Sequence, residues 1–219
     1  MAIGAVLFDL DGTLIDSAPD LAGACNDMRI DRGLEPLPYA SLRAMVGSGA
    51  RGMVGVGFGL TPDDAAYPEL RDEFLNRYEA RMTRETRLFA AVLPVLDALR
   101  GRGVPWGIVT NKATRFAAPL VACLDFGGAV TTLVCGDTTP HAKPHPAPLL
   151  EAARRLLVDA AACVYVGDDR RDVDAGRAAG MRTVVAGWGY LGRGEPSGAW
   201  GADIVIDRPD ELLDWIAGA

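Results

Sequence analysis

The sequence predicts an α/β protein in which a doubly wound, Rossmann-like parallel sheet carries an inserted all-helical domain. Three observations support this prediction. Short apolar segments alternate with helical patterns from residue 92 onward, as in proteins built from β-α-β units. The first apolar segment, residues 3–8, is instead followed by a long stretch of helical patterns only. The length of 219 residues suits one main domain with an insertion.

The strand predictions rest on apolar runs. Residues 3–8 are apolar except for Gly4, which is typical of a parallel strand covered by helices on both faces. Further strands are expected at residues 104–109, 129–135, 163–166, 182–186 and 203–206. Helices are expected between and after them, at residues 92–102, 115–124, 147–157, 172–179 and 211–216. Right-handed crossovers would connect such strands into one parallel sheet.

The inserted segment shows helical patterns at residues 21–32, 39–46 and 61–83. Ser17 and Pro19 suit the start of the first helix, and the run TPDD at residues 61–64 suits the start of the last. A glycine-rich turn at residues 46–52 leads into residues 53–60. We therefore expect a core domain of residues 1–16 and 87–219, and a helical cap domain of residues 17–86.

Composition limits the partners and the compartment. The net charge of −7 argues against nucleic acid or an anionic membrane surface as a partner, because both are negatively charged and bind positively charged protein surfaces. We expect a cytoplasmic protein, since no secretory signal and no membrane-spanning run is visible. The four cysteines form no Cys-x-x-Cys pair and are typical of free thiols in a reducing compartment.

The run DLDGT at residues 9–13 places two carboxylates just beyond the first strand. At a spacing of two residues, Asp9 and Asp11 point to roughly the same side and repel each other unless a cation lies nearby. Mg²⁺ suits such a site, because it takes one or two protein carboxylates together with a substrate phosphate. Taken alone, an Asp-Gly turn at a strand end explains the same residues.

Polar residues follow other predicted strands as well. Thr110 and Asn111 come after the strand at residues 104–109, and three aspartates, Asp168, Asp169 and Asp172, come after residues 163–166. Lys143 lies on a loop between strands. Because the carboxyl ends of parallel strands meet at one edge of a sheet, these groups are expected to converge there with Asp9 and Asp11. That convergence favours a catalytic site over a simple turn.

These segments resemble the motifs of the haloacid dehalogenase superfamily, and specifically of its phosphatases with a helical cap. The resemblance covers essentially the whole chain, through DLDGT at residues 9–13, TN at 110–111, KP at 143–144 and GDDRRD at 167–172. It implies an enzyme that hydrolyses a small phosphate ester with Mg²⁺. Asp9 would be the nucleophile, Asp11 the general acid and base, and Lys143 the stabiliser of charge. Thr110 and Asn111 would bind phosphate, and Asp9, Asp11 and Asp168 the metal.

Elementary chemistry agrees with these implied roles. A carboxylate that attacks phosphorus forms an aspartyl-phosphate and so divides one difficult displacement into two easier ones. An ammonium group and Mg²⁺ can offset the phosphoryl charge, and a second acid can serve both steps. In the predicted cap, Ser48 and Arg51 are candidate substrate ligands, because a glycine-rich turn can approach a substrate and a guanidinium can bind an anion. Arg51 on a solvated helix face is the alternative.

Two groups of capped phosphatases are similar to this chain, and both remain open. Phosphoglycolate phosphatases resemble it through residues 47–51, 110–112, 176–181 and 187–191, and this is the favoured substrate class. N-acetylmuramate 6-phosphate phosphatases resemble it through residues 49–54, 106–109 and 200–203. A sugar phosphomutase of the same superfamily would share every catalytic motif. A dehalogenase would lack Asp11, and a non-enzymatic, acidic metal-binding interaction protein would leave Lys143 and Thr110 unexplained.

Overall fold

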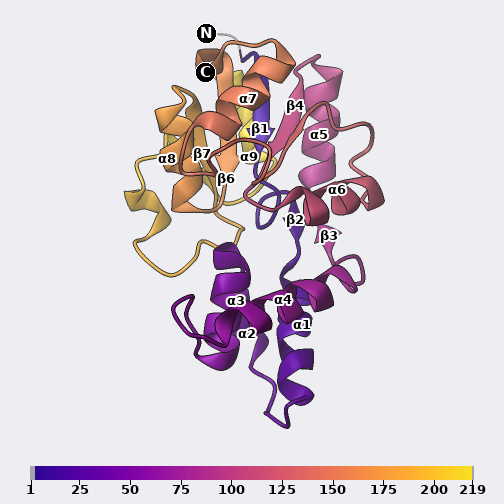
Figure 1. The fold of residues 1–219 in the computed structure, drawn as a ribbon. Helices are drawn as coiled ribbons and strands as arrows, with labels where there is room; N and C mark the ends of the chain where they lie inside the picture. The colour runs from indigo at the N-terminus through magenta and orange to yellow at the C-terminus, as the bar shows by residue number, and fades with distance from the viewer. Residues whose placement is uncertain (1–2, 219) are drawn as a thin grey trace. The chain divides into compact units, whose positions relative to one another are not determined.

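The structure is a computed structural model that describes residues 3–218 and divides into two compact units. Unit 1 holds the described residues up to Ile15, then Leu88–Gly189 and the residues from Glu195 onward. Unit 2 holds Asp16–Arg87 and Tyr190–Gly194. The chain therefore passes between the units four times. Figure 1 shows the elements of each unit along the chain.

Unit 1 is built on a six-stranded sheet with the strand order β5-β4-β1-β6-β7-β8. Every pairing between neighbouring strands is parallel. The strands are β1 (Ala5–Phe8), β4 (Trp106–Val109), β5 (Leu133–Val134), β6 (Cys163–Gly167), β7 (Arg182–Ala186) and β8 (Ile204–Ile206). This architecture confirms the predicted doubly wound α/β fold.

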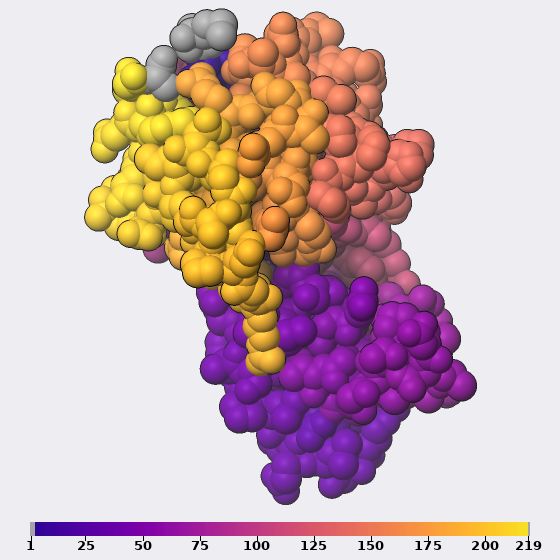
Figure 2. Space-filling view, turned by 90° about the vertical axis from the view of Figure 1, so that its left-hand side faces the viewer, coloured from indigo at the N-terminus to yellow at the C-terminus, as the bar shows by residue number. Residues whose placement is uncertain are grey.

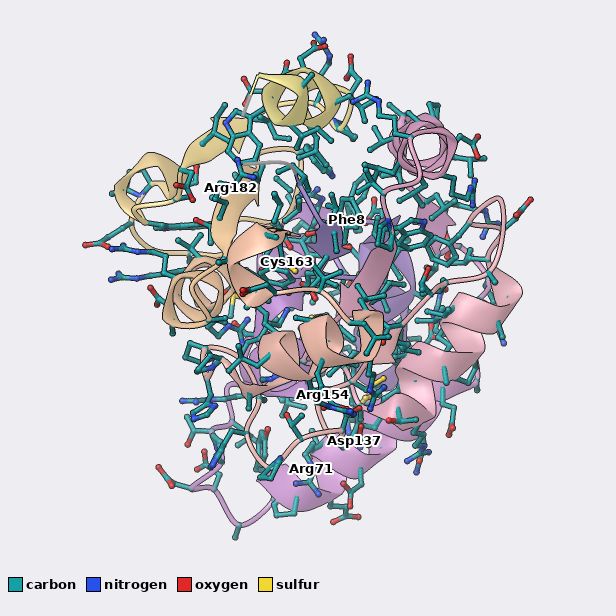
Figure 3. The ribbon with its side chains drawn as sticks, turned by 90° about the horizontal axis from the view of Figure 1, so that it is seen from above. Phe8, Arg71, Asp137, Arg154, Cys163 and Arg182 are labelled. Carbon is teal, nitrogen blue, oxygen red and sulfur yellow. The ribbon has the colours of Figure 1, made fainter. Side chains whose placement is uncertain are left out.

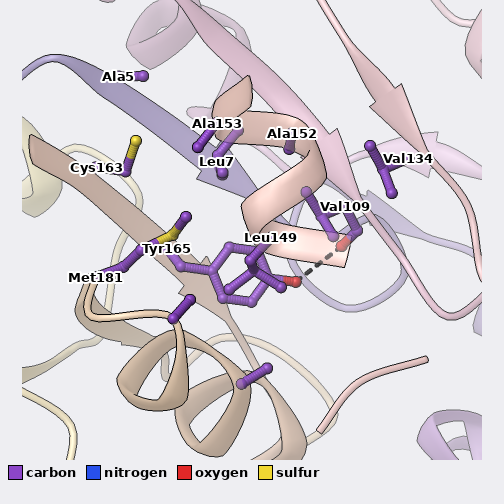
Figure 4. Packing of buried hydrophobic residues seen from close by; sticks show 12 residues of the cluster. Ala5, Leu7, Val109, Val134, Leu149, Ala152, Ala153, Cys163, Tyr165 and Met181 are labelled. Atoms are coloured by element: carbon purple, nitrogen blue, oxygen red, sulfur yellow. Dashed lines mark hydrogen bonds between the residues drawn. The ribbon is translucent and has the colours of Figure 1, made fainter. Parts of the chain in front are cut away.

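Helices cover both faces of this sheet. They are α5 (Val92–Gly101), α6 (Thr114–Cys123), α7 (Ala147–Leu156), α8 (Arg170–Ala178) and α9 (Glu211–Ala217), with short 3₁₀ turns at Ala160–Ala162 and Ser197–Ala199. Ala5 and Leu7 pack with residues of α7 and α8 on one face. Phe8 points the other way, toward α5 and α9. Figure 3 shows Phe8 and Cys163 on the strands between these layers, and Figure 4 shows the packing on the first face.

Unit 2 is helical, with a two-stranded sheet where the chain enters and leaves it. The helices are α1 (Ala18–Ile30), α2 (Tyr39–Arg43), α3 (Gly49–Phe58) and α4 (Tyr67–Glu79), with a 3₁₀ turn at Val46–Ser48. The short strands β2 (Ile15–Asp16) and β3 (Arg87–Leu88) pair with each other. Across the described residues of both units, each helix is too short or too polar to cross a lipid bilayer.

Three elements differ from the sequence-based expectation. The helix expected at residues 61–83 starts only at Tyr67, because Thr61 donates from both its main chain and its hydroxyl to the carboxylate of Asp64 and closes a separate turn. The glycine-rich turn is already helical from Gly49, and a Cβ at Gly57 would crowd the Cys25 sulfur of α1. The edge strand expected at residues 129–135 is reduced to the two residues of β5.

A buried carboxylate holds the two ends of unit 2 together. Asp20, in the first turn of α1, is fully buried. Its Oδ2 accepts hydrogen bonds from the backbone N–H groups of Glu85 (3.0 Å) and Thr86 (2.9 Å), and from the Thr86 hydroxyl. Its Oδ1 lies 3.6 Å from Nε of Arg81. The first helix of unit 2 is thereby tied to the segment that leaves it.

We expect Asp20→Ala to lower the free energy of unfolding of unit 2 by about 3–5 kcal/mol, because it leaves the donors of Glu85 and Thr86 without their acceptor and removes a buried charge next to Arg81. Asp27→Ala is the matched control. Asp27 pairs with the same Arg81 at 2.6 Å, but half of its side chain is exposed, so its loss should cost no more than about 1 kcal/mol. Urea unfolding of both variants measures the difference. Equal losses would show that Asp20 does not hold the ends of the unit together.

Candidate active site

The end of β1 places Asp9 beside two neighbouring strands. The last residue of β1 pairs with Ile108 of β4 on one side and with Val166 of β6 on the other. Because all three strands run parallel, the residues that follow them, Asp9, Thr110 and Asp168, come out at the same edge of the sheet.

A tight turn after Asp9 packs against Asp168. Gly12 has a φ of +86°, a left-handed conformation that favours glycine, and a Cβ there would overlap the Asp168 carboxylate. The hydroxyl of Thr13 donates to Oδ1 of Asp168 at 3.2 Å. Asp168 is buried, so the turn both covers this carboxylate and orients it.

Lys143 reaches this edge from the loop before α7. Its side chain is only 2% exposed, and Nζ donates to Oδ1 of Asp9 at 2.9 Å and to Oδ1 of Asp172 at 2.7 Å. Burial alone lowers the pKa of Lys143, but the carboxylates of Asp172 and Asp9 outweigh it and hold this pKa above its usual value. The ammonium group therefore stays charged between the two carboxylates.

The side chain of Asn111 fixes the main chain of Lys143. Its Nδ2 donates to the carbonyl of Lys143, and its Oδ1 accepts from the backbone N–H of Lys143, both at 2.9 Å. Both ends of the amide are thus engaged by one residue. In the structure Asn111 sets the position of Lys143, and direct binding of phosphate by its side chain stays a prediction.

Asp169 and Asp172 begin helix α8. The Asp169 side chain accepts from the backbone N–H of Arg171, and Oδ2 of Asp172 accepts from the backbone N–H of Asp169 at 3.0 Å. This reciprocal arrangement is a capping box. Asp169 also forms a two-pronged ion pair with Arg171, whose Nε and Nη2 both lie at 2.8 Å from its oxygens. Asp169 is therefore oriented by its own helix.

Asp9, Asp168 and Asp172 form a group that could hold a metal ion. Each offers a carboxylate oxygen, and these oxygens lie within 4.8 Å of one another. Burial raises the pKa of Asp9 to about 6, with Lys143 opposing the rise and Asp172 adding to it. The ammonium of Lys143 pairs with two of these three carboxylates, so a divalent cation would balance the remaining charge of the group. The donor set, all oxygen, fits a hard cation.

Asp11 and Thr110 make other contacts at the same edge. The carboxylate of Asp11 pairs with Nζ of Lys112 at 2.9 and 3.1 Å. Thr110 is buried, and its hydroxyl accepts from the backbone N–H of Lys112 at 3.1 Å. The group of three carboxylates thus includes Asp172 where the sequence suggested Asp11, and the metal set Asp9, Asp11 and Asp168 stays a prediction.

Ser48 and Arg51 belong to unit 2, at the start of α3. Ser48 is the N-cap residue of this helix, and both side chains are exposed. Their role in substrate binding stays a prediction.

Sequence reasoning missed Tyr165, whose ring lies 5.3 Å from Nζ of Lys143, measured to the ring centroid. Tyr165 is buried in β6, and its hydroxyl accepts from Nζ of Lys143 at 2.7 Å. Burial and the carboxylates of Asp172 and Asp9 raise the pKa of Tyr165 well above its usual value, so the hydroxyl keeps its proton. A tyrosine in an apolar strand is itself a signal, because a buried hydroxyl needs a partner.

The segment after β7 is a second feature that sequence reasoning left without an explanation. In unit 1, Nε1 of Trp188 donates to the carbonyl of Thr13 at 3.0 Å. A Cβ on Gly189 would overlap Asp168 and the carbonyl of Gly12, so only glycine allows this close approach. The segment therefore closes the turn that covers Asp168.

The next residue, Tyr190, belongs to unit 2. Its hydroxyl accepts from the backbone N–H groups of Ser17 (2.9 Å) and Ala18 (3.1 Å) and donates to Oδ1 of Asp16 at 3.0 Å. The guanidinium of Arg43 lies over its ring, 4.9 Å from the centroid. Tyr190 thus binds the start of α1. Figure 2 shows this part of the chain in gold.

Comparison with known proteins adds a family to this geometry. The model of the haloacid dehalogenase-like hydrolase family matches residues 6–186. A phosphoglycolate phosphatase of Xanthomonas campestris pv. campestris is 47% identical over 211 residues, which cover 96% of this chain and 95% of that protein. An N-acetylmuramic acid 6-phosphate phosphatase of Pseudomonas aeruginosa is 40% identical over 214 residues, with 98% and 95% covered.

A solved structure gives the same picture of the fold. The crystal structure of a protein from Haemophilus somnus, described as "a predicted phosphoglycolate phosphatase", superposes with a TM-score of 0.85 and covers 97% of both chains at 26% sequence identity.

Proposed function

The chain belongs to the haloacid dehalogenase-like hydrolases, and from this premise we propose that it is a Mg²⁺-dependent phosphomonoester hydrolase acting on a small phosphorylated metabolite. One observation carries the proposal. The carboxylate of Asp9 lies at the end of the central strand, 2.9 Å from a buried ammonium group and beside two further carboxylates. This arrangement supports a site in which Asp9 is the nucleophile, Lys143 a fixed positive charge and the carboxylates metal ligands.

In the first step, an oxygen of Asp9 attacks the phosphorus atom, and the bond from phosphorus to the ester oxygen breaks. Asp11 gives a proton to the leaving alkoxide. In the second step, Asp11 accepts a proton from a water molecule that attacks the aspartyl-phosphate, and inorganic phosphate leaves Asp9 free again. Lys112 orients the carboxylate of Asp11 through their ion pair.

Lys143, Thr110 and the metal ligands complete this assignment. The ammonium group of Lys143 offsets negative charge on the transferring group, and Thr110 and Asn111 would bind its oxygens. Asp9, Asp11 and Asp168 would be the direct ligands for Mg²⁺, whereas Asp172 accepts hydrogen bonds with both oxygens, from Lys143 and from the main chain of Asp169. When bound, the ion supplies positive charge next to the phosphoryl oxygens.

The relatives favour two substrates, phosphoglycolate and N-acetylmuramate 6-phosphate, with phosphoglycolate first. The test is phosphate release from both esters and from a panel of sugar phosphates, before and after treatment with EDTA and after Mg²⁺ is restored. Release that needs Mg²⁺, with one ester preferred by kcat/KM, supports the proposal and identifies the substrate. Phosphate that moves to a second hydroxyl of the sugar would indicate a mutase, and no Mg²⁺-dependent release from any ester contradicts the proposal.

Residues 17–86 would act as a cap on a core of residues 1–16 and 87–219, with Ser48 and Arg51 in contact with the part of the substrate that does not react. We expect Arg51→Ala to raise KM for the preferred ester by about tenfold, the effect of one charge-assisted contact, while kcat changes little. Arg71→Ala, on α4 of the same unit and likewise exposed, is the control. An unchanged KM in the Arg51 variant would remove this residue from the substrate site.

A further inference from the structure

Tyr165 is a buried polar group that the reaction scheme above does not use. It stands on β6 with its ring in the apolar layer that contains Leu149 and Val109. Its hydroxyl donates to the carbonyl of Val109 at 2.8 Å, the contact drawn as a dashed line in Figure 4. The same hydroxyl lies 2.7 Å from Nζ of Lys143 and 3.2 Å from Oδ1 of Asp172.

The Tyr165 hydroxyl is one of four acceptors that surround the ammonium group of Lys143. Four oxygens lie within 3.1 Å of Nζ, those of Asp9, Asp172, Tyr165 and the Val109 carbonyl. An ammonium group has three protons. If Tyr165 gives its own proton to Val109, the carbonyl is satisfied, and the three ammonium protons go to the two carboxylates and the hydroxyl.

Without the Tyr165 hydroxyl, the three ammonium protons of Lys143 have a different set of acceptors. The third ammonium proton then has the Val109 carbonyl as its neutral acceptor, at 3.1 Å, the longest of the four distances. That carbonyl belongs to β4, whereas Asp9 follows β1. The ammonium would be drawn toward the strand and held less firmly against Asp9.

We propose that Tyr165 is a positioning residue that holds the Lys143 ammonium group against the Asp9 carboxylate. Its hydroxyl donates a hydrogen bond to the Val109 carbonyl and accepts one from the third ammonium proton of Lys143. The inference rests on the proposed function, in which Lys143 offsets charge on the group that Asp9 attacks. Tyr165 acts only through Lys143 and touches no reacting atom. Its loss therefore lowers kcat and leaves substrate binding to the other residues.

The chain allows a direct measurement of Lys143, because it contains two lysines, Lys112 and Lys143. A sample labelled with nitrogen-15 lysine gives side-chain ammonium NMR signals from these two residues only. A buried ammonium held firmly by short hydrogen bonds exchanges its protons slowly and gives a sharp signal, and Tyr165→Phe would replace the 2.7 Å contact to the hydroxyl with the 3.1 Å contact to the Val109 carbonyl. The signal of Lys112 in the same spectrum serves as an internal reference.

The test compares the wild-type protein with Tyr165→Phe and with Tyr78→Phe. Tyr78 is likewise buried, with its ring stacked on Phe74 of α4 in unit 2, so its variant controls for the loss of a buried hydroxyl. In Tyr165→Phe we expect kcat to fall by roughly tenfold or more, the effect of one hydrogen bond to a charged group, with KM unchanged. The ammonium signal of Lys143 broadens or disappears, and that of Lys112 stays.

Tyr78→Phe should match the wild-type protein in kcat and in both ammonium signals. A wild-type kcat together with an unchanged Lys143 signal in Tyr165→Phe would overturn the inference. Failure of the proposed function gives a different result: the wild-type protein would then release no phosphate, while the two ammonium signals would still show whether Tyr165 holds Lys143. Thermal melting of all three proteins verifies that each is folded.

Discussion

We expect replacement of Asp9 by asparagine to lower Mg²⁺-dependent phosphate release by about a thousandfold or more, because a covalent nucleophile is removed. Asparagine has the same shape as aspartate, but its amide does not attack phosphorus, and it contributes no charge to the metal group. The measurement is kcat for the preferred ester at saturating Mg²⁺. Asp174→Asn, the same exchange at an exposed position of α8, is the control and should keep wild-type activity.

The Asp9→Asn variant also tests how the negative charge of the three neighbouring carboxylates, Asp9, Asp168 and Asp172, affects stability. An acid whose pKa is about 6 in the folded protein, above its ordinary value of 3.8, destabilises the folded state as the pH rises from about 4 to 6. Above pH 6 that cost is fully present, so in the absence of metal the variant should melt no lower than the wild-type protein at pH 7. Substantial activity in a correctly folded variant would refute the assignment of Asp9 as the nucleophile.

The second large effect on activity is expected for Lys143→Met. Methionine has a similar length and keeps the packing of the buried stem, but it leaves the carboxylates of Asp9 and Asp172 without their shared ammonium group. We expect kcat to fall by about a hundredfold or more, since one preorganised charge next to the developing negative charge is lost. Without metal at pH 7, the free energy of unfolding should fall by about 3–5 kcal/mol, the cost of breaking a buried ion pair.

Lys143→Arg separates the charge from its placement. The guanidinium keeps the positive charge, but it is planar and larger than an ammonium, so it cannot reach the same three acceptors. We expect this variant to recover much of the stability and little of the activity. Full activity in Lys143→Arg would mean that a positive charge suffices, and full activity in Lys143→Met would exclude Lys143 from the reaction.

The sequence predicted the fold because its signals are local and repeated. Apolar runs such as residues 182–186 mark buried parallel strands wherever they occur, and that strand was predicted with the bounds of β7. Predictions were wrong where a local signal competed with packing. The TPDD run forms its own turn before α4, and glycines enter α3 because small residues let it approach α1.

The candidate site was predictable as a set of positions and less so as a set of contacts. The strand ends identify Asp9, Asp168 and Thr110 as neighbours from topology alone. Which carboxylate Lys143 reaches depends on distances across the fold, so the pairs of Lys143 with Asp172 and of Lys112 with Asp11 were not foreseen. The contact of Tyr165 could not be predicted for the same reason, because its partner Lys143 is more than twenty residues away in sequence.

The place of Tyr190 in unit 2 has a consequence for protein engineering. Chimeras of multidomain enzymes usually exchange one continuous gene segment, and residues 16–87 look like such a cassette. A transplanted cassette, however, would meet the host's own residue at position 190, and α1 would lose the hydroxyl that receives the N–H groups of Ser17 and Ala18. A compatible exchange carries Tyr190–Gly194 with it, so the modular piece of this chain is discontinuous in its gene.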